Sequence, residues 1–439
     1  MSATPTQEQK PSKLTCIQTL TPPASYSTPY KKPISKTDEI LFYFSQSTAK
    51  SRPSPVWSCS WSHDGTILAT CHGRPDPAIR LWKYLQGKFT LMATIREDSD
   101  DNTNSARTIR SVKFAPTPSN VRGILAAASF DGTVSIWEDF SKESSTSSHD
   151  GNMANGWECT AQLEGHENEV KDVAWNTTGT LLASCGRDKS VWIWECFLPG
   201  TIGGEGNGSS GPNGGEGDFE CLAVLQSHEG DVKSIAFAPS HGQFGDGDEI
   251  LLSASYDDTI RCWAEDAGDW YCALTLKGVH SSTIWSLGIS ASGMRMVSGS
   301  ADKSLAIWRC YTAAEKQELM DDNDDDMNNN NDDEGMHSDG VWKCIGKLPD
   351  AHSQPIYSID CSGTRTGHGR ICSGGGDDCI NVYREINGGT TDSPLFAVDA
   401  TAKSAHTGDV NCVKWHPIDG KIIASAGDDG FVKIWSYDL

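Results

Sequence analysis

One spacing recurs seven times in this chain: an aspartate stands six residues before an aromatic residue. The pairs are Asp76/Trp82, Asp131/Trp137, Asp188/Trp194, Asp257/Trp263, Asp302/Trp308, Asp377/Tyr383 and Asp429/Trp435. The spacing is constant within each pair while the distance between pairs varies, which indicates one repeated supersecondary unit. The chain is therefore expected to fold as an array of similar units, in which repeated residues are candidates for structural roles.

The clearest copy of the unit predicts four short strands. It runs from WECTAQL through a Gly-His turn and the alternating segment VKDVAW to two strands on either side of Asp188. Four short strands per unit are typical of a WD-repeat blade. The sequence therefore predicts an all-β, seven-bladed WD40 β-propeller over residues 54–439. Its inner strands should begin near Val56, Ile109, Val170, Val232, Ile284, Ile356 and Val410.

The chain ends predict how the ring closes. Only SYDL follows Trp435, which leaves no room for a fourth strand in the last blade. We therefore expect residues 1–53 to form an N-terminal extension that supplies this strand and removes an exposed sheet edge. Lys13–Leu20 is the preferred closing strand, and residues 39–44 are the alternative.

Charge and hydropathy limit the classes of partner. The chain has 36 basic and 59 acidic residues, a formal net charge of −23, which disfavours general nucleic-acid binding. No apolar run approaches the length of a membrane span, and the polar N-terminus lacks the apolar core of a signal peptide. We expect a cytoplasmic or nuclear protein whose partners are proteins, with neither nucleic acid nor membrane bound.

The 15 cysteines raise the question of a metal site. No Cys-x-x-Cys occurs, and four cysteines fill one repeated slot, aromatic-x-Cys-x-x-x-Leu: Cys159, Cys221, Cys272 and Cys344. Thiols that are separated by whole blades cannot converge on one ion, so small apolar packing is favoured over metal ligation. An odd number of cysteines in a reducing compartment also argues against a disulfide framework. We expect no metal and no cofactor bound by this chain.

A second repeated set combines His, Ser, Asp and Trp, and on paper it resembles a hydrolytic triad. Because it recurs in five blades, a structural hydrogen-bond relay is favoured over five identical active sites. Each charge-assisted bond in such a relay contributes about 1.5–3 kcal/mol. The members are His166, Ser184, Asp188, Trp194, His228, Ser253, Asp257, Trp263, His280, Ser298, Asp302, Trp308, His352, Ser373, Asp377, His406, Ser425, Asp429 and Trp435. Blade 1 and blade 2, which has Ala127 at the serine position, depart from the pattern and should be the most weakly tied.

Three low-complexity segments follow third strands, at residues 141–156, 200–218 and 321–339. Loops after third strands emerge on one face of a propeller, so we expect all three on the bottom face as disordered, solvated excursions. The acidic segment 321–339 could recruit a basic partner, but a spacer is the favoured interpretation.

Positions on the opposite, top face do not repeat. The second residue of each inner strand is a cation in blades 2 to 4 and an aromatic residue in blades 5, 6 and 1. Cations beside exposed aromatic side chains are typical of protein-recognition surfaces. With residues that precede the repeated aspartates, they predict a partner-binding surface made of Arg187, Arg110, Lys171, Lys233, Trp57, Trp285, Tyr357, Phe130 and Tyr256.

Longer strings resemble one family. LEGHENEVKDVAW with LLASCGRDKSVWIWE, ILLSASYDDTI, and AHTGDVNCVKWHP with IIASAGDDGFVKIW are similar to cytosolic iron-sulfur protein assembly WD-repeat proteins, and the likeness covers about residues 54–439. The resemblance implies a non-enzymatic scaffold in the late step of cytosolic iron-sulfur cluster assembly, a monomer within a hetero-complex. Implied partners are a small adaptor, a HEAT-repeat scaffold, an iron-hydrogenase-like cluster carrier and apo iron-sulfur clients, some with a C-terminal tail ending in an aromatic residue. The family's important top-face arginine corresponds to Arg187.

Two other classes remain open. One is a WD40 scaffold or substrate receptor of another complex, such as a ubiquitin ligase or an RNA-processing assembly, because a propeller alone does not define its partner. The Trp-Asp-x-Arg box of such receptors is missing after the third strands, which weakens this alternative. The other class is an enzyme with a site in the channel, but the sequence has no metal constellation, phosphate loop or unrepeated nucleophile–base pair.

Overall fold

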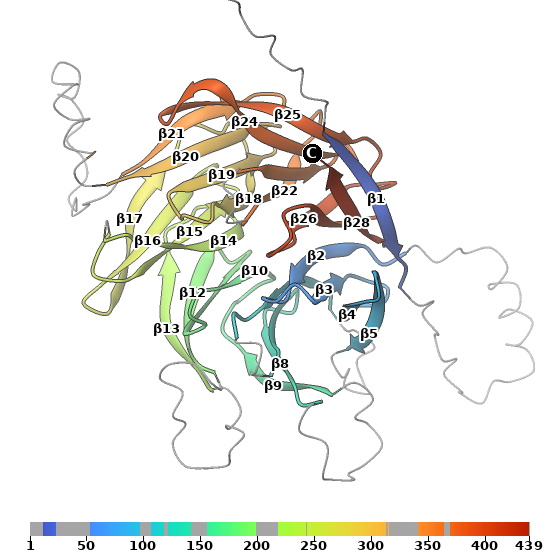
Figure 1. Cartoon of the computed structure of the whole chain (residues 1–439). Coiled ribbons are helices and arrows are strands. Elements are labelled where there is room, and N and C mark those ends of the chain that lie inside the picture. The colour runs from blue at the N-terminus through green and yellow to red at the C-terminus, as the bar shows by residue number, and fades with distance from the viewer. Residues whose placement is uncertain are drawn as a thin grey trace, which may run out of the picture.

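Seven four-stranded antiparallel sheets surround a central axis in the computed structural model of this chain (Figure 1). The predicted all-β, seven-bladed propeller is thus confirmed. The structure describes residues 12–22, 53–96, 107–117, 122–141, 156–198, 218–242, 244–312, 315, 341–363 and 369–438. Within these residues, no helix has the length and apolar character needed to cross a membrane.

The inner strands begin at the seven residues that the sequence predicts. Blades 1 and 2 consist of β2 (Val56–Trp61), β3 (Ile67–His72), β4 (Ala78–Leu85), β5 (Lys88–Ile95), β6 (Ile109–Phe114), β7 (Ile124–Ser129), β8 (Val134–Asp139) and β9 (Trp157–Leu163). Blades 3 and 4 consist of β10 (Val170–Trp175), β11 (Leu181–Gly186), β12 (Ser190–Phe197), β13 (Asp218–Gln226), β14 (Val232–Pro239), β15 (Glu249–Ser255), β16 (Ile260–Asp266) and β17 (Asp269–Leu276).

The remaining three blades complete the ring. Blades 5 and 6 consist of β18 (Ile284–Ile289), β19 (Arg295–Ser300), β20 (Leu305–Tyr311), β21 (Val341–Leu348), β22 (Ile356–Cys361), β23 (Ile371–Gly375), β24 (Ile380–Thr390) and β25 (Ser393–Ala402). Blade 7 consists of β26 (Val410–Trp415), β27 (Ile422–Gly427), β28 (Val432–Asp438) and the N-terminal β1 (Lys13–Leu20).

Two of the three expected loops, at residues 141–156 and 200–218, can be compared with the structure only at their ends. Residues 142–155, 199–217 and 316–340 lie outside the described part of the chain, as does the alternative closing strand at residues 39–44. One boundary of these loops is wrong: Asp218, expected in the second loop, is the first residue of β13 and pairs with Phe197.

The strand β1 closes the ring, which confirms the preferred assignment. It pairs antiparallel with β28, with Leu14 opposite Tyr437 and Leu20 opposite Val432, and the two strands lie side by side in Figure 1. Leu14 and Leu20 are 8% and 2% exposed. The side-chain amide of Gln18 also donates to the carbonyl of Phe89 at 2.7 Å, so β1 binds blade 1 as well as blade 7.

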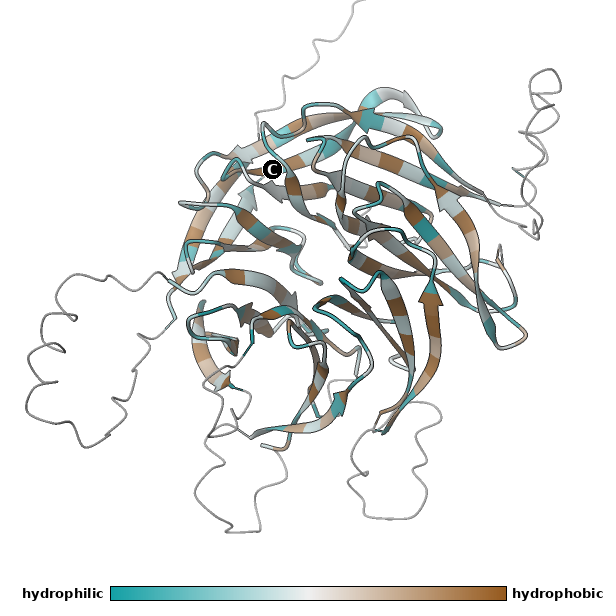
Figure 2. Cartoon of the chain, turned by 180° about the vertical axis from the view of Figure 1, so that it is seen from behind, coloured by the Kyte–Doolittle hydropathy of each residue, from teal (hydrophilic) through white to brown (hydrophobic). Residues whose placement is uncertain are grey.

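The hydrophobic core lies between blades. Figure 2 shows apolar residues along the strands, and each of the seven buried apolar clusters combines residues of two neighbouring blades. Leu252 of blade 4, for example, shares a cluster with Met296 and Trp308 of blade 5. Because each blade is completed by its neighbour, loss of one contact between blades weakens the whole ring.

Hydrogen bonds join the predicted His, Ser, Asp and Trp residues. In blade 3, His166 Nδ1 lies 2.7 Å from Asp188 Oδ2 and His166 Nε2 lies 2.9 Å from Ser184 Oγ, which also accepts from Trp194 Nε1 at 3.1 Å. Blades 4, 5 and 7 have the same three contacts, among His228, Ser253, Asp257 and Trp263, among His280, Ser298, Asp302 and Trp308, and among His406, Ser425, Asp429 and Trp435.

Blade 6 has a variant of the relay. His352 bonds with Asp377 at 2.8 Å and with Ser373 at 2.6 Å, while the hydroxyl of Tyr383 donates to the carbonyl of Ala351. Burial is the largest influence on Asp377 and opposes its ionisation, but the hydrogen bond and charge of His352, together with the backbone N–H groups of Ser353 and Cys379, lower the pKa of this carboxyl to about 2. The ionised carboxylate is therefore the form that the folded blade stabilises.

Blades 1 and 2 differ in how they replace the relay. In blade 1, Thr70 Oγ1 accepts from Trp82 Nε1 at 3.0 Å, and Asp76 pairs with the buried Arg80 at 2.5 Å. In blade 2, the exposed Asp131 accepts from the backbone and hydroxyl of Thr133 inside its own turn. The geometry agrees with the predicted weak tie for blade 2 and argues against it for blade 1.

Removal of β1 tests the closure. Deletion of residues 1–21 should lower the melting temperature and broaden the transition, because it exposes the edge of β28 and the apolar clusters that Leu14 and Leu20 complete. Circular dichroism during heating measures both effects. Deletion of residues 1–11, which leaves β1 in place, is the control, and equal cooperative melting of all three proteins would contradict the assignment.

The relay is tested by comparing two aspartates. Asp188→Ala should lower the free energy of unfolding by about 1.5–3 kcal/mol, because His166 and the backbone N–H of Glu167 then lose their shared acceptor. Asp131→Ala, at the same position of blade 2, should cost about 1 kcal/mol or less because Asp131 is exposed and bonds only within its turn. Urea denaturation measures both, and equal losses would argue against a special relay.

Candidate protein-interaction surface

A β-bulge recurs near the start of every inner strand. In each blade the register with the second strand shifts between the first and third residues of the inner strand, for example between Val170 and Asp172. A bulge redirects the side chain of the extra residue. That residue is the one singled out by the sequence in each blade: Trp57, Arg110, Lys171, Lys233, Trp285, Tyr357 or Asn411.

The backbone at the bulged position is irregular in every blade, while the type of residue at that position varies from blade to blade. The neighbouring residues Val170 and Val232 are fully buried, as are the first residues of most other inner strands, and these anchor the strand in the core between blades. The bulged side chains line the mouth of the central channel instead. We call the nine predicted residues, six of them bulged and three preceding the repeated aspartates (Phe130, Arg187 and Tyr256), the top arc.

Cations and aromatic rings alternate along the first half of the top arc. The guanidinium of Arg110 lies 5.0 Å from the ring centre of Trp57, and Lys171 Nζ lies 4.3 Å from that of Phe130. Each cation thus contacts an aromatic residue of the preceding blade, and such contacts contribute about 0.5–2 kcal/mol. Cations and aromatic side chains are therefore interleaved in this part of the top arc.

The second half of the top arc is an aromatic wall that ends on a lysine. Lys233 Nζ lies 4.1 Å from the ring centre of Tyr256 and 5.1 Å from that of Trp285. Trp285 contacts Tyr256 and Tyr357 edge to face, with ring centres 5.6 and 5.2 Å apart. Tyr256 is 41% exposed, so this wall presents an aromatic face to solvent. The four side chains form one continuous amphipathic surface.

Two carboxylates that sequence reasoning missed neutralise part of the charge. Glu169 binds Lys171 and lies 3.7 Å from the guanidinium of Arg187, while Asp231 lies 3.4 Å from Lys233 Nζ. Both acids immediately precede the first residue of an inner strand, which is the signal that could have identified them. With these two carboxylates, the top arc is therefore a mixed-charge surface with a cationic excess.

Arg187 and Lys233 are the two cations with distinctive environments. The Arg187 side chain is 55% exposed, whereas those of Lys171 and Lys233 are 10% and 8% exposed. Lys233 is largely buried: burial, together with the nearby charge of Lys171, lowers its pKa to about 8, and Asp231 offsets only part of this effect. An incoming anion would raise that pKa and relieve the repulsion.

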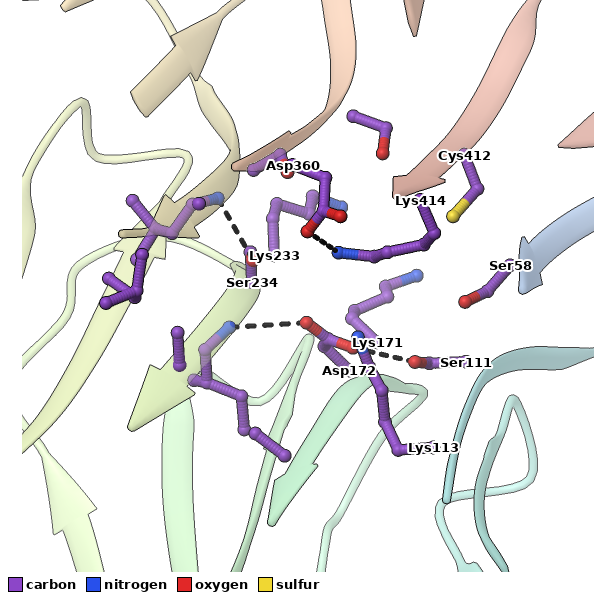
Figure 3. Close-up of a pocket in the computed structure, with 18 of the residues that line it drawn as sticks. Ser58, Ser111, Lys113, Lys171, Asp172, Lys233, Ser234, Asp360, Cys412 and Lys414 are labelled. Carbon is purple, nitrogen blue, oxygen red and sulfur yellow. Dashed lines mark hydrogen bonds and ion pairs between the residues drawn. The ribbon is translucent and has the colours of Figure 1, made fainter. Parts of the chain in front are cut away.

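The channel below the top arc has a volume of about 430 Å³ and a polar lining (Figure 3). Lys414 pairs with Asp360 at 3.0 Å, and Ser111 donates to Asp172 at 2.7 Å. Its lysines and carboxylates thus bond mainly with each other. Within the described residues, no group of three or more His, Cys, Asp or Glu side chains is placed to hold a metal ion.

A match to a protein-family model supports the predicted WD repeat. The family model described as WD domain, G-beta repeat matches residues 45–83, 100–138, 157–195, 219–264, 270–309 and 400–436. The unmatched interval contains blade 6, the blade in which Tyr383 replaces the usual tryptophan.

Curated relatives cover most of the chain. The chain is 30% identical to the probable cytosolic iron-sulfur protein assembly protein 1 of Neurospora crassa, over 89% of this chain and 96% of the relative. It is 37% identical to the protein of that name from Vanderwaltozyma polyspora, over 78% and 84%, and 36% identical to that from Candida albicans, over 88% and 97%. The similarity therefore extends over most of the chain and is not limited to the repeated Asp and Trp residues.

Proposed function

Since the chain belongs to the WD-repeat family of cytosolic iron-sulfur protein assembly protein 1, we propose that it is a non-catalytic scaffold for late cluster insertion. In this proposal it works in the cytosol as one copy in a hetero-complex. It docks a small adaptor, a HEAT-repeat scaffold, an iron-hydrogenase-like cluster carrier and the apoprotein clients. The cluster is cargo that passes between partners, and the propeller binds none of it.

The observation that carries the proposal is the interleaving of cations and aromatic rings at the bulged positions. These residues differ from blade to blade, while the buried relay repeats, so selection for stability alone does not account for their chemistry. A surface of aromatic rings and arginine at the centre of a rigid face is typical of protein-binding hot spots. We place the client contact here, on the top arc.

The top arc fits a chain end that combines a carboxylate with an aromatic side chain. The exposed Arg187 guanidinium could exchange its 3.7 Å contact with Glu169 for a two-pronged contact with an incoming carboxylate, while Glu169 keeps its bond to Lys171. The wall of Tyr256 and Trp285 could then pack against the terminal ring. Because the chain has a net charge of −23, most of its surface would repel an acidic tail, and the local cationic excess of the top arc would attract it.

A non-catalytic role is also supported by the chemistry of the conspicuous histidines. His166, His228, His280, His352 and His406 are buried side chains whose two ring nitrogens both have partners within the blade. Burial lowers the pKa of His228 and His280 and favours their neutral form. Histidines with both nitrogens engaged have no free site for proton exchange with a substrate.

Arg187→Glu is the direct test of the client contact. A peptide that ends in an aromatic residue with a free carboxylate should bind at least tenfold more weakly, a loss of about 1.4 kcal/mol or more, because attraction becomes repulsion. Fluorescence anisotropy measures the affinity. The melting temperature should stay near that of the wild type, since the Arg187 side chain is largely exposed.

Two controls sharpen this test. Lys88→Glu makes the same change of charge on the exposed first residue of β5, and it should leave the affinity unchanged. An amidated copy of the peptide, which loses the attraction to Arg187 without adding a repulsion, should bind the wild type more weakly than the acid peptide does. Equal affinity of the wild type and Arg187→Glu for the acid peptide would refute the assignment.

Lys233 predicts a pH dependence. Because its folded pKa is about 8, raising the pH from 7 to 9 removes its positive charge, and the acid peptide should bind several-fold more weakly at pH 9. Lys233→Arg keeps the charge over this range and should give a flat profile. A wild-type affinity that does not change between pH 7 and 9 would exclude Lys233 from the contact.

A further inference from the structure

Two cysteines meet where the first and last blades join. Cys59 lies on β2 of blade 1 and Cys412 lies on β26 of blade 7, 353 positions apart in the sequence. Their sulfur atoms are 3.7 Å apart, and both side chains are buried, with 0% and 5% exposure. They share one apolar cluster with Leu20 of the closing strand and Val432 of β28. The thiols are therefore in contact beneath the closure of the ring.

A repeated belt of serines explains why these two residues meet. The third residue of an inner strand approaches the fourth residue of the next blade. Thus Ser234 Oγ accepts from the N–H of Leu287 at 3.3 Å, and Ser286 Oγ accepts from the N–H of Ile359 at 3.0 Å. Ser358 repeats this contact with Val413.

At the junction of blades 7 and 1, cysteine occupies both belt positions. Cys412 is the third residue of β26, where three other blades carry these serines, and Cys59 is the fourth residue of β2, where the others carry Leu, Ile or Val. Cys412 Sγ accordingly lies near the Cys59 carbonyl as well, at 3.9 Å. The geometry of the belt thus holds the two sulfurs together in the folded ring.

Cys412 also borders the central channel. Its side chain helps to line the 430 Å³ cavity, and Figure 3 shows it beside Lys414. Hydrogen bonding from Cys59 and the charge of the Lys414 ammonium lower the pKa of the Cys412 thiol, while the contact with Cys412 and burial raise the pKa of Cys59. Cys412 is therefore the better nucleophile of the pair, and a thiolate is the reactive form of cysteine.

We propose that Cys59 and Cys412 are a modification site, at which hydrogen peroxide forms a disulfide that joins blade 7 to blade 1. The Cys412 thiolate attacks one peroxide oxygen, the O–O bond breaks, and the departing hydroxide takes a proton and leaves as water. The Cys59 sulfur then attacks the Cys412 sulfur of the sulfenic acid. The S–O bond breaks, the S–S bond forms, and the Cys59 thiol proton leaves with the hydroxyl as a second water.

This bond would change how the ring opens. Two thiols are oxidised while one peroxide is reduced to two waters, and the sulfurs move from 3.7 Å to the disulfide length of about 2.05 Å. The noncovalent junction of the two chain ends, held by β1 and one apolar cluster, becomes a covalent link that closes a loop of most of the chain. Disulfides that close long loops restrict the unfolded chain most strongly. Oxidation should therefore stabilise the propeller.

Peptide mapping of the full-length protein tests the proposal. After treatment with a small excess of hydrogen peroxide, free thiols are alkylated and the protein is digested without reduction. Mass spectrometry should find a peptide pair linked through Cys59 and Cys412, and dithiothreitol should release it. The melting temperature should rise by about 5 °C on oxidation and fall again on reduction.

Alanine variants separate this pair from the other thiols. Cys412→Ala should abolish the rise in melting temperature, whereas Cys196→Ala, which removes a buried cysteine from the cluster between blades 2 and 3, should retain it. A rise that persists in Cys412→Ala would overturn the proposal. If that variant does not fold, the map of the wild type decides alone: Cys59 and Cys412 recovered as separate peptides, under conditions that oxidise the exposed Cys16, would also overturn it.

Discussion

The antiparallel pairing of β1 with β28 is the contact on which the rest of the structure depends. Every apolar cluster is shared between two blades, so an open ring would expose an incomplete core at each end. Leu14 fills the cluster between blades 6 and 7, and Leu20 fills the one between blades 7 and 1. Each of the seven sheets would be only marginally stable alone, and the short strand β1 joins them into one ring that we expect to unfold cooperatively. The rigid mouth of the channel exists only in that closed ring.

In the closed ring, the residues that stabilise the blades are separate from those that are placed to bind partners. In blades 3 to 7 the relay holds the turn that follows the second strand. In every blade the buried first residue of the inner strand anchors its start, and the bulge turns the next side chain toward the mouth. Recognition chemistry can therefore vary at the bulge without disturbing the relay or the core. Arg187 illustrates the separation, because its exposed side chain stands next to Asp188, which is tied to His166.

Much of this arrangement can be predicted from the sequence because it repeats. The Asp-to-aromatic spacing predicts the blades and the first residue of every inner strand, and the short segment after Trp435 predicts that an N-terminal strand completes the last blade. What sequence reasoning missed depends on contacts across blades or between loop ends. The loop conformation before the inner strands places Glu169 and Asp231 within ion-pair distance of the arc cations. Closure of the ring brings Cys59 and Cys412 into contact. Blade 1 was misjudged because Arg80 and Thr70 replace the usual relay with other residue types.

We expect the varied bulge positions to bind partners, while the repeated positions hold the ring. Hydrogen–deuterium exchange of the full-length protein measures this most directly, with and without a saturating peptide that ends in an aromatic residue with a free carboxylate. Bound peptide should slow exchange at the starts of β10, β14 and β18 and in the turns that carry Arg187 and Tyr256, with no change in the turn between β4 and β5. Protection confined to other faces of the propeller would contradict it.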